Sequence, residues 1–114
     1  MIEKTLLNAL ERSTNVSAYT EIPENPPQYF IIIERTGGSQ RGHEQRAALI
    51  AVQSYAPTLL EAAELNEQVL DVMREIQFTE DEVISCILNS NYNFTDPDSK
   101  RYRYQAVFDL VYFA

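Results

Sequence analysis

The feature that most constrains the fold is a segment with helical periodicity near the middle of the chain. From residue 59 to residue 76, apolar residues recur every three or four positions over about five turns. Pro57 stands just before it, and proline is favoured at the start of a helix. The periodic positions are Leu59, Ala62, Leu65, Val69, Val72, Met73 and Ile76. We therefore expect a helix with one apolar face, which a second layer of the protein must cover.

Segments with strand character lie on both sides of this helix. The run Tyr29–Ile33 is β-branched and aromatic without a break, which predicts a strand covered on both faces. In the last strand, the even-numbered residues from Tyr102 to Tyr112 are apolar or aromatic and share one face. The predicted strands are 16–22, 29–33, 48–53, 82–93 and 101–113.

A short amphipathic helix is expected at residues 2–12, where Ile2, Leu6 and Leu10 have helical spacing. The resulting order is α-β-β-β-α-β-β. It predicts an α+β fold, a mostly antiparallel β-sheet flanked by two α-helices. The chain has 114 residues, the usual size of one domain, so we expect a single domain over residues 1–114.

A polar, glycine-rich segment separates the second and third predicted strands. Residues 36–46 are expected to form a mobile loop, because three glycines leave the backbone few restraints and little apolar content is present. We predict that this loop contacts assembly partners, with the contact made by Gly37, Gly38, Arg41, His43 and Arg46.

Charge is distributed unevenly along the chain. The net charge is -8, from 9 basic and 17 acidic residues, which argues against nonspecific nucleic-acid binding. Residues 57–82 carry eight acids and one base, a net of 1 - 8 = -7, whereas residues 35–46 have a net of 3 - 1 = +2. Four acids of the main helix share one helical face, which would line a lumen or form a solvated outer surface: Glu61, Glu64, Asp71 and Glu75.

No residue pattern indicates catalysis, and we expect that the protein is not an enzyme. Gly42 is followed by His43 and not by the Lys-Ser/Thr of a phosphate-binding loop. His43 lies in the segment predicted to be mobile, where it lacks the rigid support of a general base. With one cysteine and one histidine, we expect no internal disulfide, no metal and no cofactor. The longest apolar run is too short to span a bilayer, and we expect no membrane association and no export signal.

Three stretches of the sequence carry a family resemblance. They are residues 27–38 (PQYFIIIERTGG), residues 47–58 (AALIAVQSYAPT) and the helix start at 59–63 (LLEAA). Together they resemble the small tail terminator, or tail completion, proteins of long-tailed noncontractile bacteriophages. The resemblance is detailed over residues 23–76. Tyr55 stands where that family frequently has tryptophan, and the acidic helix is a second departure.

The resemblance implies a structural role in virion assembly. Such proteins form a ring, in this family a hexamer, that caps the tail tube and stops its polymerisation. The implied partners are the major tail tube protein and a head completion, or stopper, protein, and DNA passes through the ring without specific binding. The implied location is the head-tail junction of a virion assembled in the host cytoplasm. The alternatives are another neck component, such as a head completion protein, or a small soluble enzyme or ligand-binding domain.

Overall fold

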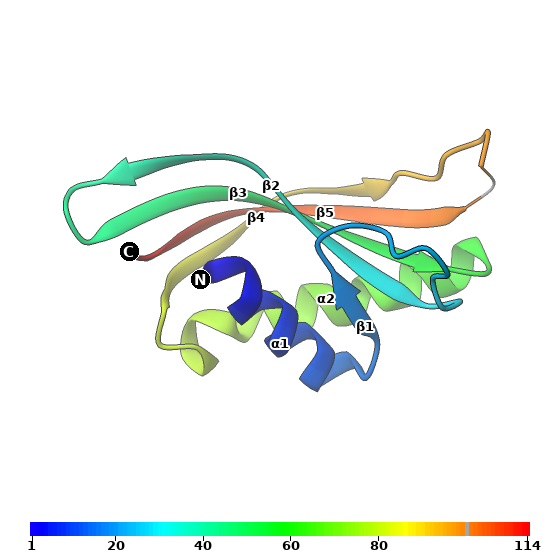
Figure 1. Ribbon diagram of the computed structural model, residues 1–114, viewed down its shortest axis with the longest axis horizontal. Coiled ribbons are helices and arrows are strands. Elements are labelled where there is room, and N and C mark those ends of the chain that lie inside the picture. Colours follow the sequence, from blue (N-terminus) through cyan, green and yellow to red (C-terminus); the bar gives the residue numbers. More distant parts are fainter. Residues whose placement is uncertain (100) are drawn as a thin grey trace.

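A five-stranded sheet and two helices make up the fold (Figure 1). The computed structural model describes residues 1–99 and 101–114, apart from the side chain of Arg41. In chain order, the elements are α1 (Ile2–Thr14), β1 (Ser17–Tyr19), β2 (Phe30–Arg41), β3 (Gln45–Ala56), α2 (Leu59–Thr79), β4 (Val83–Asn93) and β5 (Tyr102–Phe113). The predicted α+β class and element order are confirmed.

The strand order in the sheet is β1-β2-β3-β5-β4. All neighbours are antiparallel except β1 and β2, which are parallel. The β3 strand is central and pairs along its whole length with β5, from Gln45 opposite Phe113 to Ala56 opposite Tyr102. The three residues of β1 cover only Phe30–Ile32 of β2. The remainder of β2 and all of β4 therefore lie at the two edges of the sheet.

Both helices pack on the same face of the sheet (Figure 1). The core between the layers is aliphatic, with Phe108 as its largest fully buried side chain. Burying each such side chain contributes about 1.5–3 kcal/mol before entropy is counted. Residues that meet in the core are Leu6 and Leu10 of α1, Val69, Met73 and Ile76 of α2, and Ile31, Ile33, Ile50, Val52, Phe108 and Leu110 of the strands.

Local signals define the helix ends. The side chain of Thr58 accepts a hydrogen bond from the Glu61 amide at 3.2 Å and so caps the start of α2. Asn15 caps the end of helix α1 with a left-handed φ of 59°, a conformation that asparagine adopts more readily than most residues. Both helices run two or three residues beyond their predicted ends, at Thr14 and Thr79.

All five predicted strands change their limits: the last two begin one residue later than predicted, and the third extends from 48–53 to Gln45–Ala56. The first shrinks from 16–22 to Ser17–Tyr19, because the proline-containing segment that follows cannot continue a ladder of backbone hydrogen bonds. The run predicted from Tyr29 begins at Phe30, and Tyr29 itself is exposed. Residues 30–33 are all buried, so the predicted cover on both faces of this strand is confirmed.

Candidate functional site

The segment predicted as a loop is mostly β-strand. Backbone pairing between β2 and β3 continues without interruption from Gly37 opposite Leu49 to Arg41 opposite Gln45. Only residues 42–44 form the turn. The prediction of an irregular loop over residues 36–46 is therefore wrong. We refer to residues 34–46, the part of this hairpin around the turn, as the arm.

The physical reason is support from a third strand. The β3 strand is held on its other side by β5, so β2 forms its ladder on a backbone that is already ordered. The ladder compensates for glycine, which costs roughly 0.5–1 kcal/mol in a strand. At the turn, Gly42 has a φ of 76°, a left-handed value that glycine adopts without steric cost. Gly42 alone was the sequence signal for a tight turn. Because Gly37 and Gly38 were counted with it, the sequence predicted a longer loop.

The five residues predicted to contact partners all lie on the arm. His43 is exposed in the turn, and Arg46 is an exposed residue of β3 opposite Tyr112 of β5. Arg41 is the last residue of β2. A Cβ on Gly38 would lie 3.0 Å from the carbonyl oxygen of Ala47, whereas a Cβ on Gly37 would have no atom within 4 Å.

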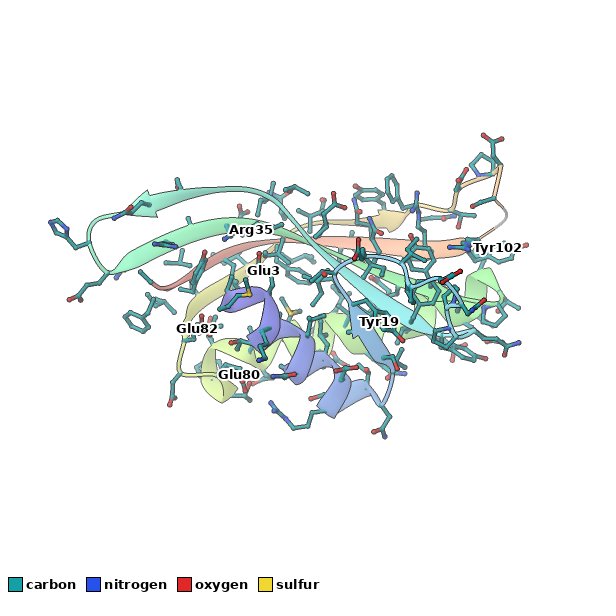
Figure 2. The ribbon with its side chains drawn as sticks, in the orientation of Figure 1. Glu3, Tyr19, Arg35, Glu80, Glu82 and Tyr102 are labelled. Carbon is teal, nitrogen blue, oxygen red and sulfur yellow. The ribbon has the colours of Figure 1, made fainter. Side chains whose placement is uncertain are left out.

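The base of the arm is fixed to the body by polar contacts. The Nε of Arg35 lies 3.5 Å from a carboxylate oxygen of Glu3, and its Nη1 donates to the Tyr112 hydroxyl at 3.0 Å. Figure 2 places Arg35 directly above Glu3 of α1. Beside the turn, the Ala114 amide donates to the Glu44 carbonyl at 2.9 Å. These contacts orient the arm relative to the helices.

A polar and aromatic network lies on the face of the sheet opposite the helices, which we call the outer face. The rings of Phe30 and Tyr55 stack with centroids 4.4 Å apart, and Arg103 donates to the Tyr55 hydroxyl at 2.8 Å. Gln53 donates to Gln105 at 2.8 Å, and both glutamines are buried. Sequence reasoning missed this network, because it joins residues 30 to 105 through the strand register.

The four predicted acidic residues lie on α2, and three of them are exposed: Glu64, Asp71 and Glu75. Glu61 is half-buried and accepts a hydrogen bond from the Tyr29 hydroxyl, and this bond raises the pKa of Tyr29. Asp71 pairs with Arg74 at 3.1 Å. Arg74 therefore partly neutralises Asp71, whereas Glu61, Glu64 and Glu75 have no ion-pair partner among the described residues, because the Tyr29 hydroxyl is neutral.

The β4 edge is the second unusual surface. None of its eleven residues is charged or proline, although 23% of the chain is charged. Ile87 is 64% exposed and Leu88 is 47% exposed. The neighbouring Cys86 lines a cavity of about 140 Å³ against α2, and burial, followed by the charge of Asp109, raises the pKa of its thiol to about 12. Cys86 therefore behaves as a protonated, weakly polar side chain.

In residues 1–99 and 101–114, no three His, Cys, Asp or Glu side chains are grouped so that they could hold a metal ion. Over the same residues, no helix combines the length and hydropathy needed to cross a bilayer. In comparisons with known proteins, no protein-family model matches the chain, and no curated protein matches it significantly.

Proposed function

We propose that this chain is a tail terminator protein of a long-tailed noncontractile bacteriophage. Its copies assemble into a ring, six in number as the resemblance implies, that caps the tail tube and stops its polymerisation. The ring offers its other side to the head completion protein at the head-tail junction of the virion. The observation that carries the proposal is the arm, an ordered extension of the sheet whose residues lie largely outside the core.

The arm has the properties of a surface that assembly would bury. Residues 34–40 and 42–44 are exposed, yet the backbone of β2 pairs with β3 as far as Arg41, with one irregularity between Arg35 and Gly37. Figure 1 shows the hairpin extending past α1 and α2, and the molecule measures 43 × 25 × 25 Å. An ordered arm binds at lower entropic cost than a mobile loop, because its backbone is already fixed. The arm also contains part of the sequence that resembles tail terminators.

Charge supports the same proposal. The arm, residues 34–46, has a net charge of 3 - 2 = +1, so the remainder of the chain has -8 - 1 = -9. Opposite signs on the arm and the body favour head-to-tail contacts between copies. In a ring through which DNA passes, Glu64 and Glu75 on the lumen side would repel the duplex and keep it from adhering. On the outside of the ring, the same residues would keep the assembly soluble.

Capping requires no catalysis. A tube grows because each added ring repeats the same complementary surface for the next one. A terminator binds that surface and presents a different one. Contacts that are weak in one subunit add up around the ring through multivalency.

The test is the tail length of a phage that lacks this gene, measured by electron microscopy. We expect overlong tails, restored to normal by the wild-type gene. A rescue gene lacking residues 39–43 tests the arm, provided that the shortened protein keeps its circular dichroism spectrum. Normal tails that fail to join heads would assign the chain to head completion instead. Normal tails joined to heads would overturn a role at the neck.

A further inference from the structure

The sheet has two free edges among the described residues. Beyond Ile32, β2 pairs only with β3. On the opposite side of the sheet, β4 pairs only with β5. Unpaired edges offer backbone donors and acceptors to another strand.

Residues 85–88 of the β4 edge lack the protection that edge strands usually have. Natural edges carry charges or proline, or are bent by bulges. The β4 strand has neither charge nor proline, and its two irregularities fall between Val83 and Ser85 and between Leu88 and Ser90. Between them, residues 85–88 form a regular stretch in which Ile87 and Leu88 are strongly exposed. This stretch is suited to pairing with another strand.

The register places the two free edges at the same level of the sheet. Ile87 lies opposite Asp109 of β5, Asp109 lies opposite Leu49 of β3, and Leu49 lies opposite Gly37 of β2. Residues directly opposite one another share a face, so this row lies on the outer face. If a second copy lies beside the first without a shift along the strands, Ile87 of one copy therefore lies opposite Gly37 of the other.

The strand directions also fit. Each step from β2 to β3, to β5 and to β4 is antiparallel, so β4 runs opposite to β2. Rotation about an axis roughly along the strands preserves their directions. The β4 strand of one copy then meets β2 of the next in antiparallel pairing. Such a head-to-tail contact closes into a ring when the rotation divides a full turn.

Gly37 gives independent support. Its φ is not positive, and a Cβ built on it would meet no atom within 4 Å, so the fold of one chain does not require glycine there. Glycine in a strand interior commonly marks the close approach of another backbone or ligand. Next to Gly37 the surface forms a hollow of about 460 Å³, bordered by Leu49 and Val111. The exposed side chain of Ile87 from a second copy would cover this position.

We propose that the partner at these edges is a second copy of this chain, with residues 85–88 of β4 in one copy pairing antiparallel with residues 36–39 of β2 in the next. The sheets of neighbouring subunits then form one continuous sheet, with Ile87 beside Gly37 of the adjacent subunit. The inference rests on the ring assembly proposed above. The opposite charges of arm and body favour another copy of the chain over an unrelated strand.

Disulfide trapping tests this row directly. In the full chain with Cys86→Ser, the pair Gly37→Cys and Ile87→Cys should give a ladder of covalent oligomers on mild oxidation, lost on reduction. Directly opposed residues have Cα atoms about 4.5–5.5 Å apart, within the range of a disulfide. Within one chain the two positions are three strand spacings apart, roughly 14 Å, which is too far. The matched control is Gly37→Cys with Tyr92→Cys, because Tyr92 occupies a different row of β4.

A second measurement does not depend on disulfide geometry. Ile87→Lys should weaken self-association at least about tenfold, measured by mass photometry over a concentration series. Phe78→Lys is the control, because Phe78 is 75% exposed on α2 and belongs to neither edge strand. Oligomers that are not trapped by the Gly37/Ile87 pair, or are trapped equally by the control pair, overturn the edge pairing. A chain that stays monomeric when concentrated overturns it as well. Tail length tests the capping function independently.

Discussion

The two halves of β2 differ in the burial of their side chains, although both pair with β3. Residues 30–33 are buried on both faces, whereas residues 34–40 are exposed. Both halves form a ladder with β3. Burial therefore determines which side chains a strand can have, while backbone pairing determines whether it is a strand. Substitutions in the covered and exposed regions should accordingly have effects of different size and sign.

The largest effect is expected in the core. Phe108→Ala should lower the free energy of unfolding by about 3–5 kcal/mol, because Phe108 is 2% exposed and its removal leaves a cavity between sheet and helices. Ile87→Ala, on the same sheet but 64% exposed, should change it by less than about 0.5 kcal/mol. Urea unfolding of both variants provides the measurement. Equal losses would contradict the distinction between covered and exposed positions.

The outer-face network should give the next largest effect. Gln105→Leu removes the acceptor of the buried Gln53 amide and should cost about 1–3 kcal/mol in unfolding free energy. Replacing both glutamines by leucine should cost less than the single change, because no Gln53 donor is then left unpaired. A double-mutant cycle in urea measures the coupling. Strict additivity of the two changes would show that the hydrogen bond between Gln53 and Gln105 does not contribute to the free energy of unfolding.

Cys86 should make stability depend on pH. Burial raises the pKa of its thiol from 9.0 to about 12, so the folded state keeps a proton that the unfolded state releases. The contribution is fully present below pH 9 and is lost as pH rises toward 12. Between pH 8 and 10 the expected loss is on the order of 1 kcal/mol. Cys86→Ala should flatten this part of the stability profile, and an unchanged slope would contradict the burial effect.

The smallest effect contrasts the two glycines of the arm. Gly37→Ala should stabilise the subunit by about 0.4–1 kcal/mol, because the space is open and the unfolded chain loses entropy. Gly38→Ala should destabilise it by on the order of 1 kcal/mol, because the new Cβ meets the Ala47 carbonyl oxygen at 3.0 Å. In thermal unfolding we therefore expect the midpoint temperature to rise for Gly37→Ala and to fall for Gly38→Ala. The same sign for both would mean that the arm relaxes around either change.

Regular side-chain periodicity predicted the helices and β5 well. The apolar spacing of α2 and the alternation of β5 each repeat over many residues, because one face packs on the same core throughout. The candidate site was predicted less well. The sequence predicted partner contacts in the Gly37-Gly38 segment, but it predicted no site at the uncharged β4 edge or at the outer-face glutamines.

The sequence alone thus determined the element types, their order and the apolar faces, since these depend on contacts within a few residues or on burial of one face. Tertiary structure decided that the arm is a strand, because its order comes from a backbone ladder with β3, which β5 supports from the other side. It also decided that Gly37 and Ile87 lie in one row at opposite edges of the sheet. No local pattern encodes that alignment, since it results from three successive strand registers between residues far apart in the chain.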